Sequence, residues 1–152
     1  MPGDVQEKMH PWMQPIFDNL DFIFQVKRPA PSGKKKSARA FSPYQDLIDM
    51  GVIQVEPLTY IRGRSIPKQY IIVDEAQNLT PHEIKTIITR AGEGTKIVLT
   101  GDPYQIDHSY LDSSSNGLSY VVQKMKGEKI FGYIFLEKGE RSPLAELASE
   151  RL

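Results

Sequence analysis

The chain has 152 residues and a balanced charge, with 19 basic and 19 acidic side chains. A balanced charge creates no global field that attracts a polyanion, so nucleic-acid binding would have to depend on local patches. The sequence has no cysteine, which excludes disulfides and thiolate chemistry and agrees with the cytoplasmic location that we expect. Its length suits one domain with a buried core, and no apolar run is long enough to span a membrane.

The first third of the sequence predicts two helices separated by a basic loop. Apolar residues at helical spacing lie within residues 1–24, where Pro15 is expected to interrupt the helix. Residues 27–41 are basic and rich in proline, glycine and serine, which predicts a flexible loop. A Ser-Pro pair at 42–43 is typical of a helix start, and residues 52–55 are expected to form a short strand.

From residue 70 onward, the pattern predicts strands that alternate with helices. Residues 70–73 form a continuous apolar run, as in parallel strands that are covered on both faces. Residues 80–83 have the sequence of a capping box, with proline at the first helical position. This alternation predicts an α/β fold with a mainly parallel sheet. The later elements are expected to be a strand, a helix, a strand and a helix, at 96–100, 116–126, 130–136 and after Ser142.

Two of the predicted strands run directly into acidic and amide side chains. Asp74 and Glu75 follow the first strand, and Asp102 and Gln105 follow the second. Charge at the tip of a buried strand is costly, so this pattern favours a metal site or a water-activating site. The sequence interval between Asp74 and Asp102 is about the length of one βαβ unit. A right-handed crossover would therefore place both tips on the same edge of the sheet.

Each tip taken alone has a simpler alternative. An apolar strand that ends in Asp-Glu is the Walker-B arrangement, in which Asp holds Mg²⁺ and Glu polarises the attacking water. A strand that ends in two solvated acids is the alternative. Residues 101–105 would equally suit a plain type I turn. The two tips together favour the metal and water side of a nucleoside triphosphatase.

Four longer segments carry a specific resemblance to a known family. They are residues 71–90, 101–107, 112–117 and 136–142. They resemble the PhoH family of P-loop ATPases, which is related to superfamily 1 helicases, and most closely the PhoH2 type, in which the ATPase follows a PIN ribonuclease domain. The resemblance implies a P-loop NTPase fold, a RecA-like three-layer sandwich around a mainly parallel sheet. It also implies ATP and Mg²⁺ as cofactors.

The resemblance implies roles for individual residues at the strand tips. By match to the family, Asp74 would bind Mg²⁺ and Glu75 would be the general base. Gln105 resembles the γ-phosphate-sensing glutamine of the family, and Asp102 would shape its turn or add to the metal shell. Arg141 resembles the arginine that these ATPases place on the γ-phosphate. An arginine that only pairs with a neighbouring glutamate is the alternative.

Three more residues are candidates for contacts to the nucleotide. Arg62 and Arg64 lie on a glycine-containing loop, where fork-shaped guanidinium groups suit the phosphates of a nucleotide or of RNA. Two solvated arginines are the alternative. Gln77 lies in the matched segment just after the Walker-B pair, and the resemblance assigns it to cofactor binding.

The phosphate-holding motif of such a site is absent from this sequence. A complete site needs Gly-x-x-x-x-Gly-Lys-[Ser/Thr], whose backbone N–H groups and lysine cradle the phosphates. The single Gly-Lys pair, at 33–34, lies in the proline-rich loop and does not match. In the family, the P-loop strand lies between the strands expected at 96–100 and 130–136. We therefore expect residues 1–152 to be the C-terminal portion of one PhoH-like NTPase domain, with a gap in its sheet.

These features lead to one main functional hypothesis and one alternative. The chain is expected to be part of an ATP-binding, ATP-hydrolysing protein that couples Mg²⁺-dependent hydrolysis to RNA remodelling. On its own it should have negligible ATPase activity, because phosphate positioning is missing. The alternative is a non-catalytic RNA- or protein-binding module that retains the scaffold. A homo-oligomer or an additional N-terminal segment would complete the sheet, and no membrane partner is expected.

Overall fold

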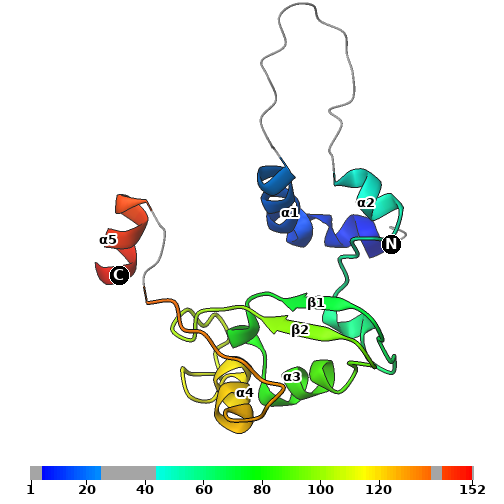
Figure 1. The fold of residues 1–152 in the computed structure, drawn as a ribbon. Coiled ribbons are helices and arrows are strands. Elements are labelled where there is room, and N and C mark those ends of the chain that lie inside the picture. Colours follow the sequence, from blue (N-terminus) through cyan, green and yellow to red (C-terminus); the bar gives the residue numbers. More distant parts are fainter. Residues whose placement is uncertain (1–4, 25–43, 138–141, 152) are drawn as a thin grey trace, which may run out of the picture. The chain divides into compact units, whose positions relative to one another are not determined.

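The computed structural model describes residues 5–24, 44–137 and 142–151 (Figure 1). The chain divides into two compact units, Met1–Tyr60 and Ile61–Leu152. The expected loop at 27–41 and the candidate residue Arg141 lie outside the described residues. None of the helices in the described ranges has the length and apolar character needed to cross a membrane.

The first unit contains the helices α1 (Val5–Phe24) and α2 (Gln45–Asp49) and the 3-10 helix η1 (Leu58–Tyr60). The expected interruption of α1 near Pro15 is wrong, because the helix runs without a break over 20 residues. A proline removes one intrahelical hydrogen bond, and a helix can continue past it on the remaining bonds. The ring of Phe17 stacks on that of Tyr44 at a centroid distance of 6.0 Å.

The expected strand at 52–55 is also wrong. The backbone N–H groups of Val52 and Ile53 both donate to the carbonyl of Leu47, at 2.8 and 3.1 Å. Gly51 precedes them with a φ of +70°, the left-handed conformation that commonly ends a helix. These amides therefore satisfy the C-terminal end of α2 and are not available for a sheet.

The second unit is built on two parallel strands, β1 (Tyr70–Val73) and β2 (Lys96–Leu99), in a register that pairs Val73 with Leu99. Both strands confirm the sequence prediction. The helices α3 (Pro81–Ile88) and α4 (Gly117–Met125) pack on one face of this sheet, and α5 (Pro143–Arg151) is the last helix (Figure 1). All three helices begin within one residue of the predicted position.

The core of the second unit lies between the sheet and the two helices. Strand alternation directs Val73 inward, where it is 6% exposed, whereas Tyr70 and Ile72 are 64% and 65% exposed. Within this unit, β1 is therefore covered on one face. The buried apolar side chains come from β1, the 3-10 helix η2 (Ala76–Asn78), α3 and α4, and are Val73, Ala76, Ile84, Ile87 and Val121.

The capping box predicted for α3 is confirmed. The Thr80 hydroxyl accepts a hydrogen bond from the Glu83 backbone N–H at 3.2 Å, and the Glu83 carboxylate accepts from the Thr80 backbone N–H at 2.9 Å. The Thr80 backbone N–H is the main reason that the pKa of Glu83 is lowered from its usual 4.5. The start of α3 is therefore held by an ionised carboxylate.

The helix α4 begins at a buried cap that the sequence alone does not reveal. Asn116 is fully buried, and its side-chain oxygen accepts from the Ser119 backbone N–H at 2.9 Å. Its amide nitrogen donates to the Asp112 carbonyl at 2.9 Å. Hydrogen bonds from the Ser114 hydroxyl and backbone lower the pKa of the exposed Asp112 to about 2. This short turn therefore orders the entry to α4.

The close approach of α4 to the start of α3 depends on Gly117. The Gly117 N–H donates to the Leu79 carbonyl at 2.7 Å. A Cβ at this position would lie 2.8 Å from the Leu79 carbonyl oxygen and 3.0 Å from that of Thr80. Both are backbone atoms, so the two segments would have to move apart to admit any side chain.

The expected strand at 130–136 is wrong, although its apolar residues suit a strand. In this segment, Ile130, Ile134 and Leu136 are 92%, 82% and 82% exposed. A strand forms only when a neighbour pairs with its backbone, about 4.8 Å away. An open groove of about 1800 Å³ lies between this segment and β2. Among the described residues, β2 pairs with β1 alone, so its second edge is open toward this groove.

We predict that Glu83→Gln lowers the stability of the chain by about 0.5–1 kcal/mol at pH 7, because it weakens the capping box. The folded pKa of Glu83 is lowered, so the contribution of the carboxylate is present above 4.5 and is lost as pH falls through the folded pKa. Urea unfolding should show that the difference in free energy of unfolding between the unsubstituted chain and Glu83→Gln becomes smaller as the pH falls through this range. Glu93→Gln, at an exposed acid outside the box, is the control. A difference that does not change with pH would contradict the prediction.

We predict that Gly117→Ala destabilises the second unit by about 1–3 kcal/mol, because the new methyl group meets two backbone carbonyls. Gly132→Ala is the matched control, since a Cβ at Gly132 meets no atom within 4 Å. The measurement is the free energy of unfolding in urea for both variants. Equal free energies of unfolding for the two variants would contradict the prediction, because they would show that α4 moves to admit the methyl group without loss of stability.

Candidate functional site

The ends of β1 and β2 lie side by side, as the sequence predicts. The hydrogen bonding of the sheet continues past the strands: Thr100 N–H donates to the Val73 carbonyl, and Ala76 N–H donates to the Thr100 carbonyl, both at 2.9 Å. The Thr100 hydroxyl donates to Asp74 Oδ1 at 2.7 Å. Asp74 is therefore oriented by the residue that follows the neighbouring strand.

Thr100 is a site residue that sequence reasoning missed. The register pairs Val73 with Leu99, so the next residues, Asp74 and Thr100, are also neighbours. The predicted parallel pairing of the two strands indicates that residues after one strand lie near residues after the other. Only the structure gives the register that makes Asp74 and Thr100 neighbours. The Thr100 hydroxyl donates to the Asp74 carboxylate and so fixes its orientation.

Glu75 adopts a strained backbone conformation at the tip of β1. Its φ and ψ are 52° and 39°, the left-handed region, which costs a residue with a side chain about 1–3 kcal/mol. Its carboxylate oxygen Oε2 accepts a hydrogen bond from Gln77 Nε2 at 2.6 Å. The strained backbone therefore accompanies a carboxylate that a neighbouring amide holds in place.

The loop after β2 brings Asp102 and Gln105 next to this tip. Asp102 Oδ1 accepts from the Tyr104 N–H at 3.0 Å, and the Asp102 carbonyl accepts from the Gln105 N–H at 3.1 Å. Asp102 therefore shapes the turn that presents Gln105, whose side chain is exposed. The Gln105 carbonyl accepts from Gln77 Nε2 at 2.8 Å.

The predicted site residues occupy different surroundings. Gln77 is fully buried among the two tips. Arg62 and Arg64 are both exposed. The pKa of Glu83, which is lowered chiefly by the Thr80 backbone N–H, is lowered further by the charges of His108 and Arg62. The structure thus brings together the residues of the two strand tips through hydrogen bonds.

The donor groups at the tips fit a hydrated Mg²⁺ ion. Both side-chain hydrogen bonds that Asp74 accepts from described residues are at Oδ1, which leaves Oδ2 for a water of a cation. Within the described ranges, no group of three or more His, Asp or Glu side chains could enclose a metal by itself. Mg²⁺ commonly takes one or two carboxylates and completes its shell with water and phosphate oxygens. One oriented aspartate is therefore a sufficient protein contribution.

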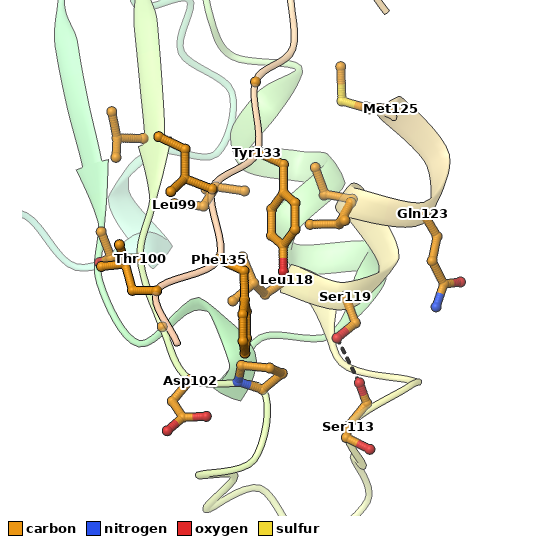
Figure 2. A pocket seen from close by; sticks show the side chains of 18 of the residues that line it. Leu99, Thr100, Asp102, Ser113, Leu118, Ser119, Gln123, Met125, Tyr133 and Phe135 are labelled. Carbon is orange, nitrogen blue, oxygen red and sulfur yellow. Dashed lines mark hydrogen bonds between the residues drawn. The ribbon is translucent and has the colours of Figure 1, made fainter. Parts of the chain in front are cut away.

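An open groove begins at these tips and runs along β2. Its lining includes Thr100 and Asp102 at one end, Leu118 of α4, and Tyr133 and Phe135 of the segment after α4 (Figure 2). The groove lies where the sequence predicts a gap, between β2 and residues 130–136. Apolar side chains from both sides therefore line an open groove.

Comparisons with known proteins agree with this architecture. The family model described as PhoH-like protein matches residues 1–150. Protein PhoH2 of Bacillus subtilis is 59% identical over 152 residues, which cover 100% of this chain and 32% of that protein. Protein PhoH2 of Mycolicibacterium smegmatis is 36% identical over 152 residues, covering 100% and 31%. A PhoH-like protein of Synechocystis is 35% identical over 147 residues, covering 96% and 40%.

The chain therefore spans about a third of the length of the first of these relatives. The match to the family model extends over both units of the chain. The family has the P-loop NTPase fold, and the parallel strands with α3 and α4 on one face are consistent with it. The chain belongs to the PhoH-like protein family.

Proposed function

We propose that the paired strand tips are the metal- and water-handling part of an ATP-hydrolysing site, in a protein that couples Mg²⁺-dependent hydrolysis to RNA remodelling. The observation that carries the proposal is the junction of the tips, where Thr100 holds Asp74 and Gln77 joins Glu75 to the Gln105 loop. Oriented acidic and amide groups at the carboxyl edge of a parallel sheet are the arrangement that such hydrolysis needs.

In this proposal, each residue has a chemical role. Asp74 holds the hydrated cation, and Mg²⁺ when bound neutralises charge on the phosphate oxygens. Glu75 polarises the attacking water and accepts its proton at the carboxylate. Gln105 contacts the γ-phosphate or the same water, and Asp102 maintains its turn. Arg62, Arg64 and Arg141 are the cations proposed for phosphate contacts, on the nucleotide or on RNA.

We further propose that the groove along β2 receives the strand that carries the phosphate-binding loop. The open edge of β2 supplies unpaired backbone groups, and the segment at 130–137 supplies a second side with strongly exposed apolar residues. The strand would come from polypeptide outside these 152 residues, in the same protein or in a partner, because the 152 residues contain no Gly-Lys-[Ser/Thr] motif. Its insertion would complete the sheet and place the phosphates beside Thr100 and Asp102.

The first experiment is a chimera in which this chain replaces the aligned stretch of Bacillus subtilis Protein PhoH2. We predict Mg²⁺-dependent release of phosphate from ATP, and a loss of about 10²–10⁴-fold in turnover for Glu75→Gln. The dissociation constant for ATP should stay within about twofold, because the substitution leaves the phosphate-binding groups in place. Glu128→Gln, at an exposed acid, is the control. Unchanged turnover in Glu75→Gln would exclude the proposed general base.

The chain alone distinguishes this proposal from a non-catalytic RNA- or protein-binding module. Since the sequence lacks the Gly-Lys-[Ser/Thr] motif, calorimetric titration with Mg²⁺-ATP should give no measurable binding. The same chain is then titrated with single-stranded RNA at two salt concentrations. RNA binding that weakens with salt and does not depend on ATP would favour the binding module.

A further inference from the structure

Gln77 is a fully buried polar side chain between the two strand tips. It lies in η2, directly after the acidic pair, and its exposed fraction is 0%. Burial of an amide is unfavourable unless its polar atoms are hydrogen-bonded. The partners of this amide therefore indicate why the chain keeps it there.

The hydrogen bonds of Gln77 fix the orientation of its amide. Nε2 donates to Glu75 Oε2 at 2.6 Å and to the Gln105 carbonyl oxygen at 2.8 Å. A primary amide nitrogen has two N–H donors, and both partners are acceptors. The reverse orientation would place Oε1 against a carboxylate and a carbonyl oxygen, so it is excluded. Both donors of Gln77 are thus used to join one tip to the other.

The opposite end of the same amide carries a cost. Oε1 is buried and has no hydrogen-bond partner among the described residues. A buried acceptor without a partner lowers stability. An apolar side chain of similar size would avoid this cost, so stability alone does not account for a glutamine here. A buried acceptor of this kind calls for an explanation, and a role in a functional site is one.

Gly101 allows the second tip to approach this amide. A Cβ built on Gly101 would overlap Gln77 Oε1 and would lie 3.2 Å from the Ala76 backbone nitrogen. Any side chain at Gly101 would therefore displace the Gln77 amide or separate the tips. The backbone of Gly101 therefore packs directly against the buried amide of Gln77, and this contact requires that Gly101 has no side chain.

From this geometry we infer that Gln77 is a positioning residue, which sets the Glu75 carboxylate and the Gln105 loop in a fixed relation without touching the nucleotide. The inference rests on the proposed function and deepens it. If Glu75 polarises the water and Gln105 contacts the γ-phosphate or that water, their relative position decides the rate of the chemical step. For Gln77, this positioning role takes the place of the direct nucleotide contact that the family resemblance implies.

The test uses Gln77→Met, which keeps the length of the side chain and removes both donors. Gly101→Ala is the second variant, because it retains the Gln77 amide and displaces it. Gln69→Met is the matched control, since Gln69 is exposed in the same unit. The first measurement is hydrogen–deuterium exchange on the 152-residue chain. We expect exchange in residues 101–107 to be about tenfold faster in both variants, with α4 and the control unchanged.

The second measurement is the steady-state kinetics of the same variants in the Bacillus subtilis chimera. A positioning role predicts a kcat lower by about 10–100-fold with KM for ATP within about twofold. A higher KM with unchanged kcat would overturn the inference in favour of a nucleotide contact. Unchanged exchange in both variants would also overturn it. An inactive parent chimera would contradict the proposed function, whereas the exchange data would still decide whether Gln77 holds the two tips together.

Discussion

The parallel pairing of β1 with β2 is the interaction on which the rest of the second unit depends. Its ladder extends beyond the strands through the backbone of Thr100. This extension brings two loops that are distant in sequence into hydrogen-bonding range, so that Asp74 is oriented by Thr100. Each tip alone would be a solvated turn. The ladder makes them one arrangement of acidic, hydroxyl and amide groups.

The helices beneath the sheet keep this arrangement in place. Ile84 is fully buried at the centre of the core, and Gly117 lets α4 meet the start of α3 at backbone distance. The segment between Asp74 and α3 is short, so the position of the helix constrains the left-handed conformation of Glu75. Close packing on one side of the sheet thus supports backbone strain at its edge.

Along its outer side, β2 pairs with no further strand in the part of the chain that the structure describes, and the proposed function depends on this open side. Apolar residues at 130–136 have the composition of a strand, yet the open groove beside β2 leaves them without a pairing partner. A family member in which the phosphate-binding strand occupies this groove would bury these side chains and pair the edge of β2. The same insertion would bring phosphate-binding groups to the tips.

The sequence by itself determined the elements whose cause is local. Patterns among residues close in sequence predict the capping box of α3, the helix α4 and the two apolar strands. The acidic residues at the strand tips are likewise read directly from the sequence. The strands expected at 52–55 and 130–136 failed because a strand requires a distant partner, which local pattern does not supply. Only the tertiary structure placed Thr100 on Asp74 and buried Gln77 between the tips, because those contacts depend on strand register and packing.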